Sequence, residues 1–354
     1  MVKNIRMLSQ QLAQPLFDHP RELVSWMGAI QAQDCIMSKW AVGIRLKSGS
    51  LSQVEKALES GEIIRTHVLR PTWHMVVAED VRWMLQLTGK RIKSACLSWG
   101  KNFGIDEPIY SKSYKQLEKI LKNNRHLTRL EIGEELSSSG TIADKSQLNC
   151  VLSLAETDGL ICNGIEKNKK HTYALMDERV PPAKKLYKDE ALAMLAQKYF
   201  RSHSPASLQD FTWWSGLTIT EAKHAIKLIE TELVTDRFDS ENFYLHESYT
   251  QANEVDGALH LLPPYDEFLI SYKERVHVLE KKHYPKAFTS YGIFYPVILQ
   301  NGKIIGNWKK TTKKNLISIE TSFFDKQSKT GRKHIKPAEE RYKSFITGNR
   351  LKSS

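Results

Sequence analysis

The chain has 354 residues, 41% of them hydrophobic, and its 52 Lys and Arg residues outnumber 40 Asp and Glu residues, for a formal net charge of +12. No stretch approaches the roughly 18–20 apolar residues that a membrane span needs, and polar residues come too early in the N-terminal segment for the apolar core of a signal peptide. Length and composition therefore predict a cytoplasmic globular protein of about two or three domains. The positive charge favours a polyanionic partner, of which nucleic acid is the usual one.

Several classes of enzyme are excluded because their motifs are absent from the sequence. The four cysteines lie far apart, with no C-x-x-C and no histidine pair at ligand spacing, so we expect reduced thiols and no structural metal. The sequence has no G-x-x-x-x-G-K-[ST] phosphate loop, no G-x-G-x-x-G after a strand and no G-x-S-x-G nucleophile elbow. We therefore expect neither a metal nor another cofactor.

The N-terminal quarter of the chain is expected to form a winged-helix-like unit. A short helix is predicted over 9–14, and His19-Pro20 opens a second helix whose apolar residues keep helical spacing as far as Ile30. A third helix is predicted over 51–62. The run 63–77 then alternates in character, as the two strands of a hairpin do.

The clearest unit of this kind is the segment 113–176, which is predicted to form three helices followed by a hairpin, the element order of a winged helix-turn-helix. Its third helix runs from about Ser146 to Thr157, and the basic run "IEKNKK" forms the tip of the hairpin. The same order returns over 189–247, where Ser204-Pro205 is expected to open the second helix. Capping pairs at predicted helix starts are Ser50 with Gln53, Thr128 with Glu131, and Thr218 with Glu221.

The residues after position 258 are β-branched and aromatic, and Asn301-Gly302 is a strong signal for a two-residue hairpin turn. Beyond them, the tail 326–354 holds nine Lys and Arg residues against two Glu, which suits contact with a phosphate backbone or a disordered end. We therefore predict an α+β fold with three tandem winged helix-turn-helix units and a small antiparallel β-domain. The predicted domains are 1–108, which includes a connecting helix, 109–180, 181–250, and 251–354 with the basic tail.

The stretch "MGAIQAQDCIMSKWAVG", residues 27–43, places Gln31, Gln33 and Asp34 at the edge of an apolar helix. In a continuing helix, Gln31 and Gln33 would point about 200° apart. The two side chains converge only if the helix ends near Ile30 and the chain extends, because residues i and i+2 of an extended chain face the same way. From spacing alone, solvated residues at a helix end are the simpler interpretation.

A wider pattern changes that interpretation. The stretches "WMGAIQAQD", "KWAVGIRL", "GEIIRTHVLRPTWHMV", "SPASLQDFTWWSGL", "LLPPYDEFLISYKER" and "VILQNGKIIGNWKKT" resemble the winged-helix DNA glycosylases of the AlkZ/YcaQ type and span most of the chain. The resemblance implies three winged helices and a β-domain around a DNA channel, and an activity that excises alkylated bases and unhooks interstrand crosslinks. The family motif Gln-x-Gln falls on Gln31-Ala32-Gln33, as in the AlkZ-like branch, whereas the other branch carries Gln-x-Asp.

The resemblance implies that Gln31 and Gln33 position and polarise the water that attacks the sugar C1′. A glutamine amide has no protonation change near neutral pH and no full negative charge, so the pair suits a leaving group that is already cationic, such as an N7-alkylated purine. We therefore expect a monofunctional DNA glycosylase for DNA repair, with N7-alkylguanine and interstrand crosslinks as candidate substrates. No lysine suited to a Schiff base stands beside the glutamines, Lys39 being the nearest in sequence.

Double-stranded DNA is the expected partner, bound by a monomer. Along the hairpin, basic and polar side chains alternate and are predicted to face the duplex; in the alternative interpretation the hairpin is buried, and His67 and His74 satisfy backbone groups. Lysines of the wing and of the third helix of the 189–247 segment are expected to contact phosphates. The predicted DNA contacts are Arg65, His67, Arg70, Thr72, His74, Lys169, Lys170, Lys223 and Lys227.

Four further residues are predicted to support the site. Asp34 could supply a carboxylate, but an extended chain would aim it away from Gln33, which favours a structural or capping role. In "PPYDEF", Tyr265, Asp266 and Glu267 form a compact acidic and aromatic group. This group could orient the arginines of the hairpin, and structural support is the favoured interpretation.

Two other functions remain open at this stage. A non-enzymatic winged-helix DNA-binding protein, such as a transcriptional regulator, is usually dimeric with one reading unit per chain, whereas three units are predicted here. A protein-binding scaffold would show at best weak, salt-sensitive affinity for DNA.

Overall fold

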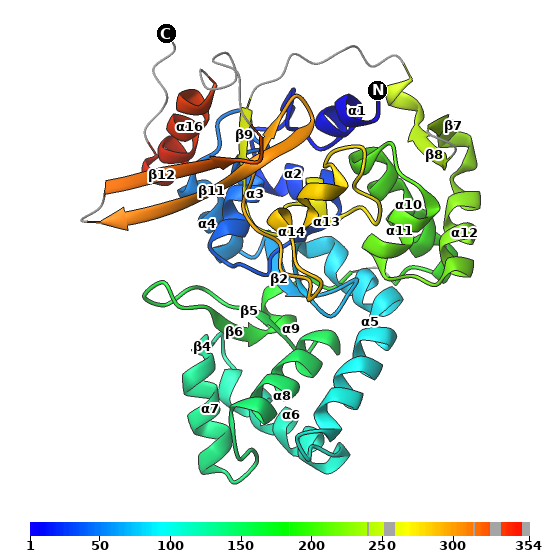
Figure 1. The fold of residues 1–354 in the computed structure, drawn as a ribbon. Helices are drawn as coiled ribbons and strands as arrows, with labels where there is room; N and C mark the ends of the chain where they lie inside the picture. The colour runs from blue at the N-terminus through cyan, green and yellow to red at the C-terminus, as the bar shows by residue number, and fades with distance from the viewer. Residues whose placement is uncertain (184, 239–240, 251–258, 314–315, 326–333, 349–354) are drawn as a thin grey trace. The chain divides into compact units, whose positions relative to one another are not determined.

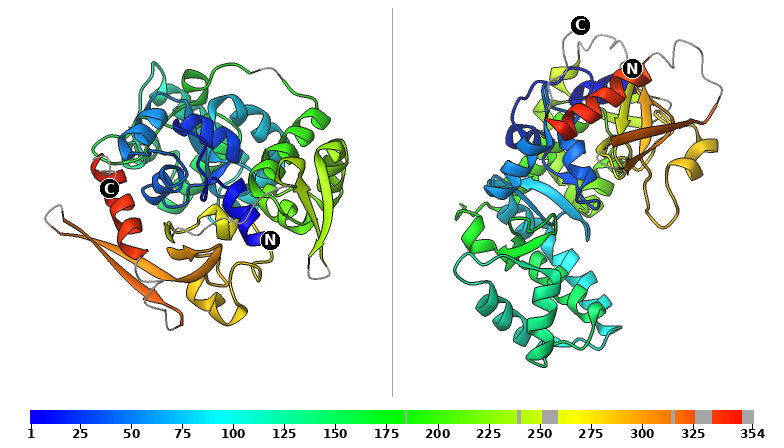
Figure 2. Two further views of the ribbon diagram at one scale, coloured as in Figure 1. Left: turned by 90° about the horizontal axis from the view of Figure 1, so that it is seen from above. Right: turned by 90° about the vertical axis from the view of Figure 1, so that its left-hand side faces the viewer.

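The computed structural model shows helices and small antiparallel sheets alternating along the chain (Figures 1 and 2). Two compact units are formed, residues 1–56 with 192–354 (unit 1) and residues 57–191 (unit 2). Two helices, α4 (Leu51–Glu59) and α10 (Lys188–His203), have residues in both units. The residues that the structure describes are 1–183, 185–238, 241–250, 259–313, 316–325 and 334–348.

Unit 1 holds the Gln-x-Gln motif and the predicted β-domain. Its other helices are α1 (Val2–Ser9), α2 (Pro20–Met27), α3 (Met37–Gly43), α11 (Leu208–Ser215), α12 (Ile219–Leu228), η1 (Glu230–Glu232), η2 (Glu247–Tyr249), α13 (Glu267–Ile270), η3 (Lys281–His283), α14 (Tyr284–Ala287) and α16 (Ile335–Thr347). Its strands are β1 (Ile30–Gln31), β7 (Leu233–Phe238), β8 (Glu241–His246), β9 (Leu259–Leu262), β10 (Val297–Gln300), β11 (Lys303–Lys313) and β12 (Leu316–Phe323).

The predicted antiparallel β-domain is present as a four-stranded sheet of order β12-β11-β10-β9. The turn between β10 and β11 is at Asn301-Gly302, as predicted, and both residues have the positive φ (50° and 70°) that such a turn requires. The registers pair the residues of β11 beyond Asn307 with β12 alone, so the outer part of the β11–β12 hairpin is a two-stranded ribbon (Figure 1).

Part of the predicted basic tail folds as α16, which packs against β9 and α3 (red in Figure 1). Ala338, Tyr342 and Phe345 are buried, and the rings of Tyr342 and Phe345 lie 5.2 and 5.0 Å from the ring of Trp40. The interpretation of this stretch as a disordered end was therefore wrong. Residues 326–333 and 349–354 of the tail lie outside the described residues.

The contact between α16 and α3 predicts a large effect at Gly43, the last residue of α3. A Cβ atom there would overlap the ring of Phe345, so we expect Gly43→Ala to lower the free energy of unfolding by about 1–3 kcal/mol. Gly89→Ala is the control, because this helical glycine has 3.4 Å of space to the nearest atom, the backbone oxygen of Thr157. Urea unfolding of both variants would contradict the prediction if Gly43→Ala were as stable as Gly89→Ala.

Unit 2 has a hydrophobic core between its helices, with α5 packed along α8. Its helices are α5 (Ala78–Lys101), α6 (Glu107–Leu121), α7 (Arg129–Ser138), α8 (Lys145–Thr157) and α9 (Met176–Arg179). Its strands are β2 (Ile63–His67), β3 (Trp73–Val77), β4 (Leu127–Thr128), β5 (Ile161–Asn163) and β6 (Thr172–Leu175), of which β2 and β3 form the predicted hairpin and the others a sheet of order β4-β6-β5.

The predicted order of three helices and a hairpin is confirmed in α6, α7, α8 and the β5–β6 pair, and again in α10, α11, α12 and the β7–β8 pair. The three predicted capping pairs are also present as hydrogen bonds. The domain boundaries at 108, 180 and 250 stay predictions, because the two compact units divide the chain at other positions.

Two local predictions were wrong. The first helix is Val2–Ser9, and the residues after it turn instead of continuing as a helix over 9–14. Helix α11 is opened by Ser207, whose side chain accepts from the backbone of Asp210, and not by Ser204-Pro205. The pattern Ser207-x-x-Asp210 was the signal for that cap. It is a capping box in which aspartate takes the place of the more usual glutamate or glutamine.

Candidate functional site

The Gln-x-Gln motif lies just beyond a helix end in unit 1. Helix α2 stops at Met27, Gly28 takes a φ of +75°, and the chain extends at β1 before bending again at Gln33. Helix α2 therefore ends before Ile30, as the predicted convergence of the two glutamines requires, but the extended stretch ends before Gln33, where the chain bends. That the two side chains face the same way stays a prediction. Gln31 is only 3% exposed whereas Gln33 is exposed, so Gln33 is the glutamine that solvent and large ligands reach.

Glu267, the first residue of α13, holds the peptide of Gln31. Its Oε1 accepts a hydrogen bond from the backbone N–H of Gln31 at 2.5 Å. Its Oε2 accepts from the indole Nε1 of Trp214 at 3.2 Å and from the hydroxyl of Ser271. The Nε2 atom of His203 lies 3.5 Å from the same oxygen. The carboxylate is fully buried.

This environment keeps Glu267 ionised. Burial alone raises the pKa of the carboxyl group, but the interactions with His203 and the hydrogen bonds from Ser271 and Gln31 outweigh burial and lower the pKa to about 2. The pKa of His203 is lowered, first by burial and against the pull of Glu267, so the neutral imidazole is favoured. The motif therefore lies against a buried negative charge.

The lowered pKa of Glu267 predicts an acid-dependent loss of stability. Because the folded pKa is below the ordinary value of 4.5, the stabilisation is fully present above about pH 4.5 and is lost as the pH falls towards 2. The shift corresponds to at most about 3 kcal/mol. Urea unfolding at a series of pH values should give a steeper loss for the wild type than for Glu267→Gln over this range, and parallel curves would contradict the assignment.

Asp34 caps the next helix, the role that the sequence favoured. Its Oδ1 accepts hydrogen bonds from the backbone N–H groups of Ile36 and Met37 at 3.0 and 2.9 Å, at the start of α3. Its charge also acts on neighbouring side chains, among them Tyr265 and Lys310. The pKa of Tyr265 is raised by burial and by Asp34, and burial lowers the pKa of Lys310 while Asp34 opposes that change.

Lys310 is a residue that sequence reasoning missed. It lies on β11, is partly buried, and its Nζ stands 5.6 Å from the centre of the Tyr342 ring. The alternation of side chains between the two faces of β11 was the available signal for Lys310. The neighbouring Lys309 is exposed and paired with Glu320 at 2.9 Å. Lys310 therefore interacts electrostatically with Asp34, the residue that follows Gln33.

Asp266 forms a buried bidentate ion pair with Arg45, another residue that the sequence did not single out. The two guanidinium nitrogens donate to the two carboxylate oxygens at 2.9 and 2.8 Å, and both side chains are almost fully buried. Arg45 also donates to the side chain of Gln10 at 3.0 Å. The alternative in which Asp266 and Glu267 orient the hairpin arginines is corrected in favour of structural support. Asp266 pairs with Arg45, and Glu267 accepts hydrogen bonds from Gln31, Trp214 and Ser271.

The β2–β3 hairpin in unit 2 is more buried than its predicted contact with DNA requires. Arg65 and His67 are each 5% exposed and His74 is fully buried. His67 Nδ1 lies 2.6 Å from a carboxylate oxygen of Glu156, which also accepts from Trp73, and His74 Nδ1 is hydrogen bonded to a backbone oxygen. Burial favours the alternative interpretation, a buried polar hairpin, for these three side chains, and their contact with DNA stays a prediction.

The other predicted DNA contacts lie nearer to solvent. Arg70 and Thr72, next to the turn of this hairpin, are partly buried. Lys169 has a φ of 60° in the loop between β5 and β6, where the backbone bridge between Lys167 and Lys170 closes the tip. The four lysines predicted to contact phosphates are all exposed, and they are Lys169 and Lys170 in unit 2 and Lys223 and Lys227 on α12.

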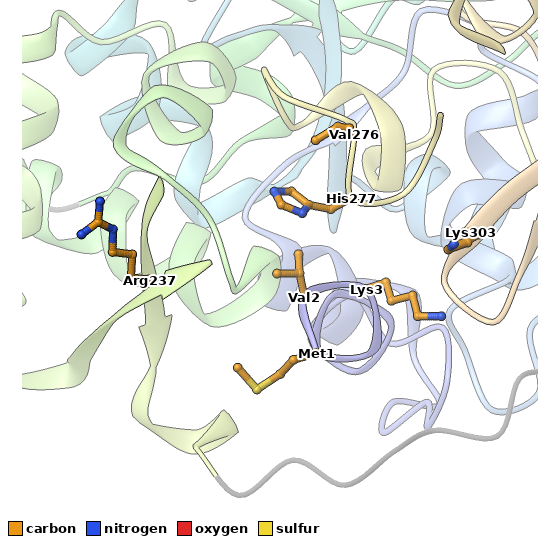
Figure 3. A pocket seen from close by; sticks show the side chains of 7 residues that line it. All are labelled: Met1, Val2, Lys3, Arg237, Val276, His277 and Lys303. Atoms are coloured by element: carbon orange, nitrogen blue, oxygen red, sulfur yellow. The ribbon is translucent and has the colours of Figure 1, made fainter. Parts of the chain in front are cut away.

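A basic pocket of about 580 Å³ forms a second feature of unit 1 (Figure 3). Neither glutamine of the motif contributes to its lining, so the pocket is separate from the Gln-x-Gln site. Among the described residues no group of three or more His, Cys, Asp or Glu side chains is arranged to hold a metal ion. The residues that line the pocket are Met1, Val2, Lys3, Arg237, Val276, His277 and Lys303.

The protein thus has an α+β fold and an exposed glutamine, Gln33, shortly after the end of α2. The neighbouring peptide of Gln31 is hydrogen bonded to the buried carboxylate of Glu267. A family model for the "DNA glycosylase AlkZ-like" family matches residues 24–345, and the chain therefore belongs to the AlkZ-like DNA glycosylases. The solved structure of Streptomyces sahachiroi DNA glycosylase AlkZ has a similar fold, with a TM-score of 0.79 at 19% identity over 98% of this chain and 96% of that one. No curated protein matches the chain. Among the described residues, no helix has the length and apolar character needed to cross a membrane.

Proposed function

We propose that this DNA glycosylase is monofunctional and hydrolyses the N-glycosidic bond of alkylated purines, with N7-alkylguanine as the first candidate and interstrand crosslinks as the second. The observation that carries this proposal is the Gln31-Ala32-Gln33 motif, which follows α2 with Gln31 in a short strand and Gln33 exposed at a bend, in a chain of this family. We also propose that the protein acts as a monomer in the cytoplasm.

The proposed reaction is the attack of water on C1′ of the deoxyribose. The bond between C1′ and the purine N9 breaks, its electron pair moves to the purine, and the water oxygen forms the new bond to C1′ and loses a proton to solvent. The amide oxygen of Gln33 accepts a hydrogen bond from this water and orients it, and Gln31 assists from the buried side of the motif. Orientation is the contribution that a neutral amide can make, because it cannot take up the proton.

This chemistry accounts for a preference for cationic bases. An N7-alkylated purine becomes neutral as it leaves, whereas an undamaged purine must leave as an anion or be protonated first. A neutral amide pair therefore provides enough assistance for the first and too little for the second. Release of unmodified purines as fast as N7-methylguanine would contradict this explanation.

The exposed lysines of the β5–β6 loop and of α12 are proposed to hold backbone phosphates. Each phosphate contact that is removed should reduce the slope of log K against log salt by about 1. We expect the double variant Lys169→Ala/Lys170→Ala to bind DNA of any sequence more weakly and with a smaller salt slope. Fluorescence anisotropy at several salt concentrations tests this, with Lys47→Ala as the control, since Lys47 is exposed and paired with Asp18 at 3.0 Å. An unchanged slope in the double variant would remove these lysines from the interface.

The test of the activity uses duplex DNA that contains a single N7-methylguanine. The proposal expects release of the methylated base and an abasic site that alkali cleaves, with no strand break before alkali and no covalent adduct after borohydride. Borohydride trapping would overturn the monofunctional assignment. Tight binding to one sequence without base release would favour a transcriptional regulator instead.

A further inference from the structure

The chemistry of the motif leaves one requirement unmet. As the glycosidic bond breaks, positive charge develops on the deoxyribose, and glycosidases commonly stabilise such charge with a carboxylate. Neither Gln31 nor Gln33 carries a charge, and the Asp34 carboxylate is engaged in capping α3. A fixed negative charge from elsewhere in unit 1 would meet this requirement.

Glu267 is the carboxylate in direct contact with the motif. Its Oε1 accepts a hydrogen bond from the backbone N–H of Gln31, so the negative charge is in direct contact with the motif. The chain separation of 236 residues means that this contact exists only in the folded protein. Because the side chain is fully buried, its field is screened far less than that of a surface carboxylate.

The hydrogen-bond partners of Glu267 suit an anion better than a neutral group. The peptide of Gln31, the indole of Trp214 and the hydroxyl of Ser271 all donate to the carboxylate. A protonated acid or an amide would turn a donor of its own towards these donors. The lowered pKa of the carboxyl group agrees with this arrangement. The ionised state is thus built into the packing around the residue.

We propose that Glu267 is a positioning residue for the Gln31-Ala32-Gln33 motif. It fixes the peptide of Gln31 by a hydrogen bond and supplies, at that peptide, the negative charge that the two amides lack. This inference rests on the proposed hydrolysis. During bond cleavage the preorganised charge favours the cationic transition state over the ground state, so it acts on kcat and not on DNA affinity. Glu267 itself does not touch the substrate.

The test compares Glu267→Gln with Asp210→Asn in single-turnover assays on the N7-methylguanine duplex. Asp210 is a matched control in the same unit. Its buried carboxylate also accepts backbone hydrogen bonds, from Ser207 and Lys273, and these partners lie outside the motif. We expect Glu267→Gln to lower the rate of base release by about 10- to 100-fold with an unchanged dissociation constant for DNA. Asp210→Asn is expected to lose stability and to keep its rate at temperatures where it is folded.

Two further variants separate the charge of Glu267 from its packing. Glu267→Asp retains the charge and should recover part of the rate. If Glu267→Gln does not fold, Trp214→Phe removes one donor to the carboxylate and keeps a smaller aromatic ring at the same buried position, and a reduced rate with unchanged DNA affinity is expected. A wild-type rate in folded Glu267→Gln overturns the inference while the glycosylase activity stands. If Trp214→Phe has to be used in place of Glu267→Gln, a wild-type rate in Trp214→Phe has the same meaning. A wild type that releases no base overturns the proposed function and this inference with it.

Discussion

Replacing Gln33 with alanine is expected to lower the rate of base release by at least about 100-fold, the usual cost of removing one group that acts at a transition state. Gln33 is the exposed glutamine of the motif, so its amide is the one that can hold a water against the sugar of a bound duplex. Affinity for DNA should stay the same, because binding depends mainly on phosphate contacts from other parts of the surface. Single-turnover release of N7-methylguanine and fluorescence anisotropy measure the two quantities separately.

The matched control is Gln86→Ala, which removes an exposed glutamine from α5 in the other unit. This variant should keep the wild-type rate and the wild-type affinity. Equal rates in Gln33→Ala and Gln86→Ala would end the assignment of Gln33 to the chemistry. A loss of rate accompanied by an equal loss of affinity would make Gln33 a binding residue instead.

Replacing Arg45 with methionine is expected to cause the largest loss of stability among single changes near the site, about 3–5 kcal/mol. The change leaves the Asp266 carboxylate buried without its bidentate partner, and it also removes the hydrogen bonds from Arg45 to Gln10 and to the backbone of Ala41. Chemical unfolding followed by circular dichroism gives the free energy directly.

A second change distinguishes the cost of an unpaired charge from the loss of packing. Asp266→Asn, made together with Arg45→Met, removes the charge and keeps an oxygen that can accept from the backbone of Phe268. The double variant should therefore be more stable than Arg45→Met alone. The exposed pair Lys309 and Glu320 is the comparison, since breaking an exposed ion pair costs little. If Arg45→Met were no more destabilising than Lys309→Met, the buried pair would not have the structural importance given to it here.

Much of the local structure could be predicted because it depends on neighbouring residues. Asn301-Gly302 predicts a hairpin turn since both residues adopt a positive φ at low cost, and the turn is present. The Thr128–Glu131 capping box forms because its two side chains are one helical turn apart. The helix predicted over 9–14 shows the limit of this reasoning. These residues form a turn after α1, in which Gln11 has a φ of 59°.

The sequence by itself determined the family motif, the element order of the helical units and the position of the hairpin turn, because each depends on residue type and spacing over short stretches. Only the tertiary structure decided which glutamine is exposed, that the hairpin histidines are buried, and that Glu267 lies against the peptide of Gln31. These features join residues that are dozens to hundreds of positions apart. Burial and partner choice at such distances are set by how the elements pack, and periodicity along a single stretch carries no information about that packing.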